Sequence, residues 1–405
     1  MTTIPADRIY SLEGKGLKLT TAEEFEPYLE ELRSFENLEE LRLNGNTIGA
    51  EAAKALAEVL RTKPTLKVAT FHDIFTSRLK DEVKESVIAI CGALSHLPSL
   101  IELNLSDNAF GPLGASAMSD FLKKHTILEV LKLNNNGLGI QGGTTIASAL
   151  IECQAECESQ GKTPALHTIV CGRNRLENGS APIFAKAYAA LKSLREVRMP
   201  QNGIRPEGIA ELVTGLASNP NLTVLDLQDN TFTEPGSAAL ANALPGWSTL
   251  ETLNIGDCLL GAAGGRLVIE ALKVCTTLKT LNLQYNEIEM DGAIALAESL
   301  RDLKNLESIE INGNRFDAES NAVELIKAAL SENDLDDDIL GSLSDMEEIT
   351  DDEDEEDEDE EDSDKEEEEE EVKSKVDATG PKTASDVLGD DLADLVSQMK
   401  KDLAI

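Results

Sequence analysis

The chain has 405 residues and a formal net charge of −40, so it is long enough for two or three ordinary domains or for one continuous repeat array. Of the 21 residues from Asp351 to Glu371, 19 are acidic; this acidic run contributes −18 and residues 372–405 contribute −1, which leaves −21 on the first 350 residues. Such a surface repels nucleic acid and anionic membranes and attracts basic proteins, so neither of the first two is an expected partner.

The N-terminal stretch "MTTIPADRIYSLEGKG" lacks the long apolar run of a signal peptide, and no later stretch approaches the length of a membrane span. We therefore expect a soluble, intracellular protein. Its six cysteines and four histidines form no recognisable disulfide or zinc pattern, which predicts reduced thiols and no metal site.

A repeated pattern of leucines runs through most of the chain. The template L-x-x-L-x-L-x-x-N occurs five times, at residues 38–46, 100–108, 128–136, 222–230 and 278–286. Looser copies end at Ile74, Asn174, Asn202, Cys258 and Asn314. Successive final positions of the template are separated by 28, 34, 28, 38, 28, 28, 28, 28 and 28 residues. This regularity identifies a repeat architecture.

A 28-residue unit with a helix predicts an α/β fold, a leucine-rich-repeat horseshoe of the ribonuclease-inhibitor type. Parallel strands would line the concave face, and helices such as residues 49–60 and 291–300 would cover the outside. A degenerate unit at residues 9–19 would cap the N-terminal end, making about 11 units, and residues 321–333 would form the last helix.

Three regions follow from this organisation. Residues 1–344 form the repeat domain, and residues 345–385 form an acidic disordered region, because dense like charges offer nothing apolar to bury. Residues 386–405 belong to a stretch that reads as a short amphipathic helix, a partner-binding segment or a largely unfolded tail, and the sequence leaves these alternatives open.

The residue just before the final position of each template is not needed for the core, and these residues form a column along one rim. The column consists of Gly45, Asp73, Asp107, Asn135, Arg173, Gln201, Asp229, Asp257, Tyr285 and Gly313. Loops of any solenoid are solvated, so a polar rim alone says little about function. Nevertheless, the column is where we look for contact residues.

Two connections break the 28-residue period, and solenoids often place recognition in longer connections. The first contains "FHDIFTSRLKDE" (residues 71–82), in which Arg78 and Lys80 are a basic pair within an acidic body. Neighbouring carboxylates would hold this pair, and spacing alone leaves open whether Arg78 is a structural anchor or a contact residue. The second contains "ECQAECESQGKTPA" (residues 152–165).

Two sequence features resemble catalytic or nucleotide-binding motifs but lack residues that those motifs need. The "GKT" at residues 161–163 resembles the end of a phosphate-binding loop, but Glu156 stands where that loop needs a glycine. The four histidines fall in different repeats and suggest no Ser/His/Asp or Cys/His set. We expect no enzymatic chemistry by this chain alone.

Several segments that the repeat template does not explain resemble the family of GTPase-activating proteins of the nuclear-transport GTPase Ran. These segments are "LNGNTIGAEAA", "FHDIFTSRLKDE", "LSDNAFGP", "LNNNGLG", "CGRNRLENGS", "QNGIRPEGI", "LQDNTFT" and "LQYNEIE", in order across residues 40–290, followed by the acidic run. The chain resembles the short form of the family, without the additional C-terminal domain of animal members.

The resemblance implies a protein that is not an enzyme itself but acts in trans on the active site of Ran. In this family an asparagine on the rim positions Ran's own catalytic glutamine, and no arginine finger is inserted. The motif places that asparagine at Asn135, and it makes Arg78 important for activity. No cofactor is expected on this chain, because GTP and Mg²⁺ are bound by Ran.

The resemblance also implies the partners and the contact residues. The expected Ran-binding residues are Asn46, Asp73, Lys80, Asp107, Asn134, Arg173, Gln201, Asp229 and Asp257. Arg173 and Arg175 would contact Ran or pair with Glu177. We expect a monomer that binds the GTP form of Ran, enters a ternary complex with a Ran-binding protein, and acts in a cytoplasmic or perinuclear pool to give nuclear transport its direction.

Two other functions fit the same composition. A ribonuclease-inhibitor-like binder would use an acidic concave face against a basic enzyme, although the single Trp and four Tyr provide few aromatic anchors. An acidic chaperone for basic proteins would act through its tail. Deleting residues 345–405 should abolish the chaperone function and leave GTPase activation intact.

Overall fold

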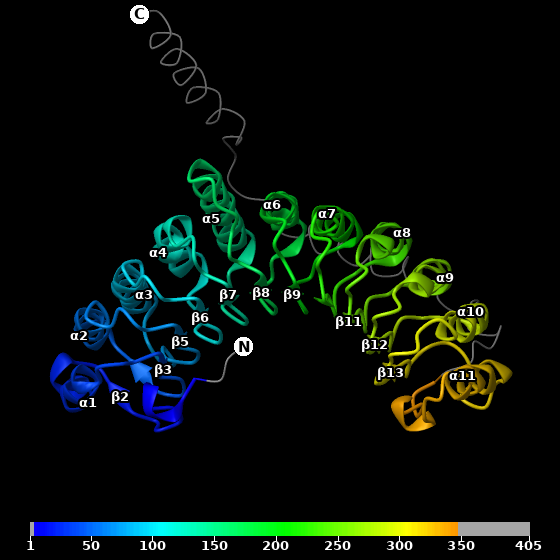
Figure 1. Cartoon of the computed structure of the whole chain (residues 1–405), viewed down its shortest axis with the longest axis horizontal. Coiled ribbons are helices and arrows are strands. Elements are labelled where there is room, and N and C mark those ends of the chain that lie inside the picture. The colour runs from blue at the N-terminus through cyan, green and yellow to red at the C-terminus, as the bar shows by residue number, and fades with distance from the viewer. Residues whose placement is uncertain (1–3, 347–405) are drawn as a thin grey trace, which may run out of the picture. The chain divides into compact units, whose positions relative to one another are not determined.

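The computed structural model describes residues 4–346, and within them the dominant element is one parallel sheet of 11 short strands with helices on one side (Figure 1). The strands are β1 (Ile9–Ser11), β3 (Glu40–Arg42), β5 (Val68–Thr70), β6 (Glu102–Asn104), β7 (Val130–Lys132), β8 (Thr168–Val170), β9 (Glu196–Arg198), β10 (Val224–Asp226), β11 (Thr252–Asn254), β12 (Thr280–Asn282) and β13 (Ser308–Glu310). They follow one another in sequence order across the sheet. A second sheet pairs β2 (Lys18–Leu19) with β4 (Thr47–Ile48).

Each strand of the large sheet is followed by a helix on the outer side of the arc (Figure 1). The α-helices are α1 (Ala22–Ser34), α2 (Ala50–Leu60), α3 (Lys80–Leu94), α4 (Gly111–Lys124), α5 (Gly139–Ser159), α6 (Glu177–Leu191), α7 (Pro206–Leu216), α8 (Thr233–Ala243), α9 (Gly261–Ala271), α10 (Met290–Leu300) and α11 (Asn321–Glu332). Short 3₁₀ turns lie at Ala6–Arg8, Leu244–Gly246, Leu272–Val274 and Asp337–Ile339. The predicted leucine-rich-repeat horseshoe is confirmed.

The core lies between the strands and the helices. The middle residue of every strand in the large sheet is buried, as Leu103, Leu131 and Leu253 illustrate, because alternate side chains of a strand point to opposite faces. Small helical residues let neighbouring helices approach closely. A Cβ added to Gly215 in α7 would lie 2.3 Å from the backbone oxygen of Ala185 in α6.

The final asparagine of the template forms a ladder of amides inside the strand-to-helix turns, interrupted at Ile74 and Cys258. The side chain of Asn136 donates to the carbonyls of Leu105 and Leu133, at 2.9 and 3.1 Å, and its oxygen accepts from the backbone N–H of Asn108 at 3.0 Å. Asn174 repeats the pattern by accepting from the N–H of Asn136 at 2.9 Å. One side chain thus satisfies buried backbone groups of two adjacent units, which explains why asparagine recurs.

Both ends of the repeat array are covered. At the N-terminal end β1 pairs with β3, and Thr21 and Glu24 form a capping box at the start of α1. At the C-terminal end the chain turns back after α11, and the N–H of Gly341 donates to the carbonyl of Ile309 in the edge strand at 3.0 Å. The predicted acidic and C-terminal regions lie, from residue 347 onward, outside the described residues, so their boundaries stay predictions.

Candidate functional site

Every residue of the rim column lies in the left-handed backbone region. Their φ angles run from 48° at Asp73 to 73° at Gly45. Glycine, asparagine and aspartate tolerate this conformation better than other residues, so the turn itself explains their frequency in the column. It does not explain Arg173, Gln201 and Tyr285, because the left-handed backbone conformation is less favourable for these residues.

Asn135, in the turn between β7 and α5, is exposed and held in one orientation. Its side-chain N–H donates to Oδ1 of Asp107, the preceding residue of the column, at 3.0 Å. Its backbone N–H donates to the carbonyl of Gly172 at 2.9 Å. This arrangement leaves the amide oxygen of Asn135 directed away from its one side-chain partner and available to a ligand.

Asn134 supports this turn from the concave side. Its side-chain oxygen accepts from the N–H of Gly172 at 2.5 Å, and its own N–H donates to Oγ of Ser106 at 3.1 Å. Gly172 cannot carry a side chain, because a Cβ there would lie 2.8 Å from Pro200. The two asparagines therefore have different roles: Asn134 fixes the turn and Asn135 is presented by it.

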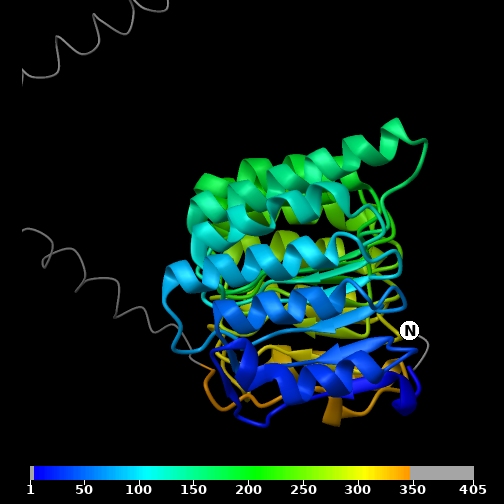
Figure 2. The ribbon, with the colours of Figure 1, turned by 90° about the vertical axis from the view of Figure 1, so that its left-hand side faces the viewer.

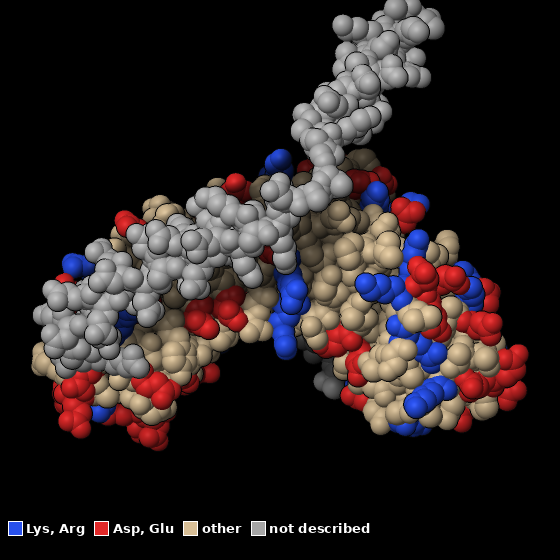
Figure 3. All heavy atoms as spheres, turned by 180° about the vertical axis from the view of Figure 1, so that it is seen from behind, with Lys and Arg blue, Asp and Glu red and all other residues tan. Residues whose placement is uncertain are grey.

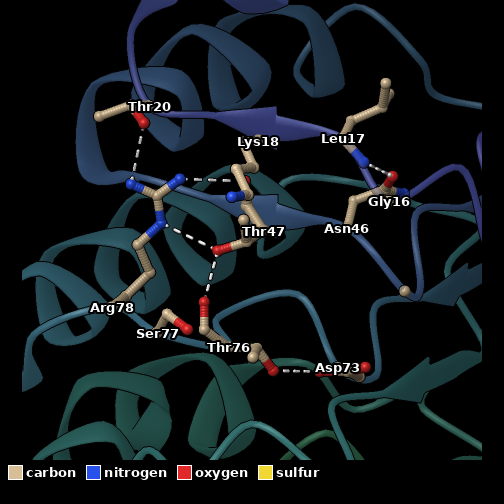
Figure 4. A pocket seen from close by; sticks show the side chains of 11 residues that line it. Gly16, Leu17, Lys18, Thr20, Asn46, Thr47, Asp73, Thr76, Ser77 and Arg78 are labelled. Atoms are coloured by element: carbon tan, nitrogen blue, oxygen red, sulfur yellow. Dashed lines mark hydrogen bonds between the residues drawn. The ribbon is translucent and has the colours of Figure 1, made fainter.

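Arg78 ties the irregular loop to the two preceding repeats (Figure 4). Nε donates to Oγ1 of Thr47 at 3.0 Å, Nη2 donates to the carbonyl of Thr47 at 3.1 Å, and Nη1 donates to Oγ1 of Thr20 at 3.1 Å. The carboxylate of Glu82 lies 3.4 Å from Nη1. Only 10% of the side chain is exposed. Hydroxyls and a carbonyl therefore hold Arg78 more than the carboxylates we expected, and its geometry is that of an anchor.

The anchor borders a pocket of about 410 Å³ on the same rim. Its lining includes Lys18, Thr47, Asp73 and Ser77 (Figure 4). Asp73 accepts a hydrogen bond from the hydroxyl of Thr76, which rigidifies the loop. By contrast, Lys80, the first residue of α3, is exposed and has no ion pair within residues 4–346.

Two arginines flank the ladder residue of the next repeat. Arg173 and Arg175 are both exposed, and both have positive φ angles, of 55° and 52°. Across the part of the chain that the structure describes, neither forms an ion pair, so of the two alternatives the pairing with Glu177 is not observed. Figure 3, which faces the rim where strands end and helices begin, shows Lys and Arg side chains gathered near its middle.

The C-terminal half of the column has its own pairs. Gln201 donates to Oδ2 of Asp229 at 2.6 Å, which repeats the amide-to-carboxylate geometry of Asn135 and Asp107. Asp229 and Asp257 line a hollow of about 320 Å³. Tyr285 donates to Asp345 of the returning C-terminal segment at 2.7 Å, a contact that sequence reasoning missed because the two residues are 60 positions apart.

One predicted contact residue has a structural position instead. Asn46 is 5% exposed, and its amide donates to the carbonyls of Leu12 and Leu43 and accepts from the N–H of Leu17. It is the first member of the buried ladder and has no free polar atom for a partner. The other predicted residues lie on or beside the rim.

Potential metal ligands and thiols are scattered over residues 4–346. No group of three or more His, Cys, Asp or Glu side chains in that range could hold a metal ion. All six cysteines are free thiols, and burial raises the pKa of Cys91, Cys153, Cys171 and Cys258 to about 12. None of the described helices has the length and apolarity needed to cross a membrane.

Comparison with known proteins supports both the repeat and the resemblance. A leucine-rich-repeat family model matches residues 36–57, 96–119, 218–241 and 274–297. Ran GTPase-activating protein 1 of Saccharomyces cerevisiae is 43% identical over 234 residues, which cover 56% of this chain and 57% of that protein. Ran GTPase-activating protein 1 of Xenopus laevis is 47% identical over 197 residues, or 48% of this chain and 34% of the relative.

A ribonuclease inhibitor from Sus scrofa is more distant, at 29% identity over 225 residues, 46% of this chain and 44% of the inhibitor. The chain thus spans from about a third to somewhat more than half of the length of these three relatives. By these matches and by its fold, the chain is a leucine-rich-repeat protein and a relative of the Ran GTPase-activating proteins.

Proposed function

We propose that this chain stimulates GTP hydrolysis by the small GTPase Ran and that it does so through Asn135. The observation that carries the proposal is the exposed amide of Asn135, oriented by Asp107 at 3.0 Å, in a chain related to Ran GTPase-activating proteins. A small GTPase hydrolyses GTP slowly when the glutamine that aligns the attacking water is mobile. An amide that binds this glutamine accelerates the reaction by positioning it.

The geometry of Asn135 suits that role. Because its N–H is engaged by Asp107, its oxygen can accept a hydrogen bond from the side-chain amide of the partner's glutamine. The turn is fixed on both sides by Gly172 and Asn134, so little freedom is lost when the partner binds. Arg78 would support activity by holding the neighbouring loop, because its guanidinium is almost buried and is not free to enter the partner's active site.

Rim residues on either side of Asn135 would dock Ran in its GTP form. The proposed contacts are Asp73, Lys80, Asp107, Asn134, Arg173, Gln201, Asp229 and Asp257. The free arginine at 173 would meet acidic groups, and the carboxylates at 229 and 257 would meet basic groups. GTP and Mg²⁺ would belong to Ran, and the activator would be a monomer without a cofactor of its own.

In the cell the same activity would keep Ran in its GDP form on one side of the nuclear envelope and thereby give nuclear transport its direction. We place the chain in the cytoplasm or near the nucleus, and in a ternary complex with a Ran-binding protein.

The test is single-turnover hydrolysis of GTP on Ran, with the full-length chain in catalytic amounts. We expect stimulation of at least about a thousandfold, the scale that activating proteins reach. Ras in place of Ran is the control for specificity. Absence of stimulation, or equal stimulation of both GTPases, would contradict the proposal.

One observation favours a second candidate, a ribonuclease-inhibitor-like binder, namely the 29% identity to such an inhibitor. The concave face fits this function less well. Its carboxylates are largely paired along the strands, as in Glu102 with Lys132 at 2.6 Å and Glu251 with Lys279 at 2.9 Å. Trp247 is fully buried and offers no anchor. Inhibition of pancreatic-type ribonuclease at stoichiometric concentration would support this candidate.

A further inference from the structure

The two helices that begin beside Asp107 and Asn135 start with uncharged stretches, in a chain that is otherwise densely charged. Residues 133–151 contain no charged residue, and neither do residues 108–119, whereas 28% of the whole chain is charged. These two stretches form the turns after β7 and β6, most of α4 and the first half of α5, and the two helices pack side by side. Figure 3 shows a broad uncharged surface on this side of the N-terminal half.

Two exposed aliphatic side chains lie within the uncharged stretches, and a third, Leu79, lies beside them between Arg78 and Lys80. Leu79 is 77% exposed, Leu113 is 45% exposed and Ile140 is 41% exposed. They lie at the starts of α3, α4 and α5, at the ends of the turns that carry Asp73, Asp107 and Asn135. We call these three residues the apolar strip. Pro112 is also exposed. Gly111 and Gly139, the first residues of α4 and α5, have no side chains.

The fold does not require this absence of charge. A carboxylate in the first turn of a helix is stabilised by the helix dipole. Among the 11 α-helices of residues 4–346, eight have an acidic residue there, and α4 and α5 are two of the three that do not. The helices on both sides follow the rule, with Asp81 in α3 and Glu177 in α6. The two helices that begin beside Asp107 and Asn135 therefore lack the acidic residue that their immediate neighbours have, as α9 does elsewhere in the array.

We propose that the apolar strip is the surface on which the nucleotide-bearing face of the GTPase rests, an inference that depends on the proposed function. GTP carries several negative charges, so carboxylates at the starts of α4 and α5, in addition to that of Asp107, would repel it. Leucine and isoleucine side chains there are removed from water when the GTPase docks, and this burial of apolar surface stabilises the complex. Lys80 on one side and Arg173 on the other are the cations that flank the strip.

The test compares variants of the strip in the single-turnover assay, with the concentration of the full-length chain varied. The double variant Leu113→Gln/Ile140→Gln removes apolar contact without adding charge, and Ile140→Glu adds a carboxylate. The matched controls are Ile88→Gln and Ile88→Glu, because Ile88 is similarly exposed, at 50%, but lies midway along α3.

We expect the double variant to raise the half-saturating concentration about tenfold, as for a central interface residue, and to leave the plateau rate within about twofold. Ile140→Glu should raise that concentration more than Ile140→Gln, and the difference should shrink with added salt. The Ile88 variants should match the wild type. Thermal unfolding of each variant checks that the array is intact.

The outcomes separate the two proposals. No stimulation by the wild-type chain overturns the function and the strip together. Stimulation that the strip variants leave unchanged, or that the Ile88 variants weaken equally, overturns the strip alone. A lower plateau rate with an unchanged half-saturating concentration also overturns it, because docking is then not what these side chains provide.

Discussion

The two segments that break the 28-residue period lie on opposite rims of the array. The first extends the connection from β5 to α3 and lies on the rim of Asn135. The second lengthens α5 to 21 residues and adds the connection to β8, so its end projects from the other rim (Figure 2). Both had been expected to serve recognition, yet only the first can share a surface with the candidate site. An insertion can therefore contribute to the candidate site only if it lies on the rim where the strands end.

The two insertions are also held differently. Arg78 connects the first to Thr20 and Thr47 of other repeats, so its shape depends on long-range contacts. The second closes locally: the N–H of Lys162 donates to the carbonyl of Cys157 at 2.9 Å, and Gly161 has a φ angle of 65°. These features form a Schellman motif at the end of α5. The first insertion is thus integrated into the rim, and the second is a self-contained helix extension.

The largest expected effect is that of Asn135→Ala on GTP hydrolysis by Ran. Losing the amide that positions the partner's glutamine should lower the plateau rate at least about a hundredfold, the cost of losing one preorganised hydrogen-bonding group. The matched control is Gln201→Ala, because Gln201 has the same backbone region and the same amide-to-carboxylate bond two repeats away. A plateau rate unchanged by Asn135→Ala, or lowered equally by Gln201→Ala, would remove Asn135 from the mechanism.

Next in size is the effect of Arg78→Ala on stability. The substitution leaves Thr47 and Thr20 without their shared donor, and hydrogen bonds to charged groups contribute roughly 1.5–3 kcal/mol. We expect the free energy of unfolding to fall by about 3 kcal/mol in urea denaturation. Lys80→Ala, in the same region but exposed, should change it by less than about 0.5 kcal/mol. Equal stability of both variants would show that the first insertion is not anchored as described.

Charge-reversal variants on the two rims can be compared by their half-saturating concentrations for Ran. Asp229→Lys/Asp257→Lys should raise the half-saturating concentration for Ran about tenfold by replacing attraction with repulsion at the docking rim. The same reversal at two exposed carboxylates of the second insertion, Glu156→Lys/Glu158→Lys, should change it less than about twofold, because screening weakens charges on the far rim. A larger effect of the second pair would place the docking surface on the opposite rim.

The period of the leucines was enough to predict the strands, the outer helices and the ladder, because a buried asparagine closes the turn in most repeats. The left-handed column was not predicted, since nothing in the spacing reveals that Asp107 or Asn135 has a positive φ. Contacts between distant repeats were also missed: Arg78 meets Thr20 across 58 positions. Nothing in the leucine pattern marks Leu79 and Ile140 as surface residues, and only their exposure in the folded chain distinguishes them from core residues.

The smallest expected effect is a pH dependence of stability beside the second insertion. His125 stacks on Phe121, its Nε2 lies 2.8 Å from the carbonyl of Leu100, and burial lowers its pKa below the usual 6.5. The unfolded chain therefore binds a proton first as the pH falls below 6.5, so stability decreases there, by at most about 1.4 kcal/mol per pH unit.

His125→Gln should flatten this dependence in urea denaturation between pH 7 and 5 and should leave stimulation of Ran at pH 7 unchanged. The histidine lines a small cavity with Cys153 and Leu166, on the side of the array away from Asn135. If the variant weakened stimulation at pH 7, the two rims would be coupled through the core. An unchanged pH dependence would instead show that His125 is protonated alike in the folded and unfolded chain, and that its burial is without consequence for stability.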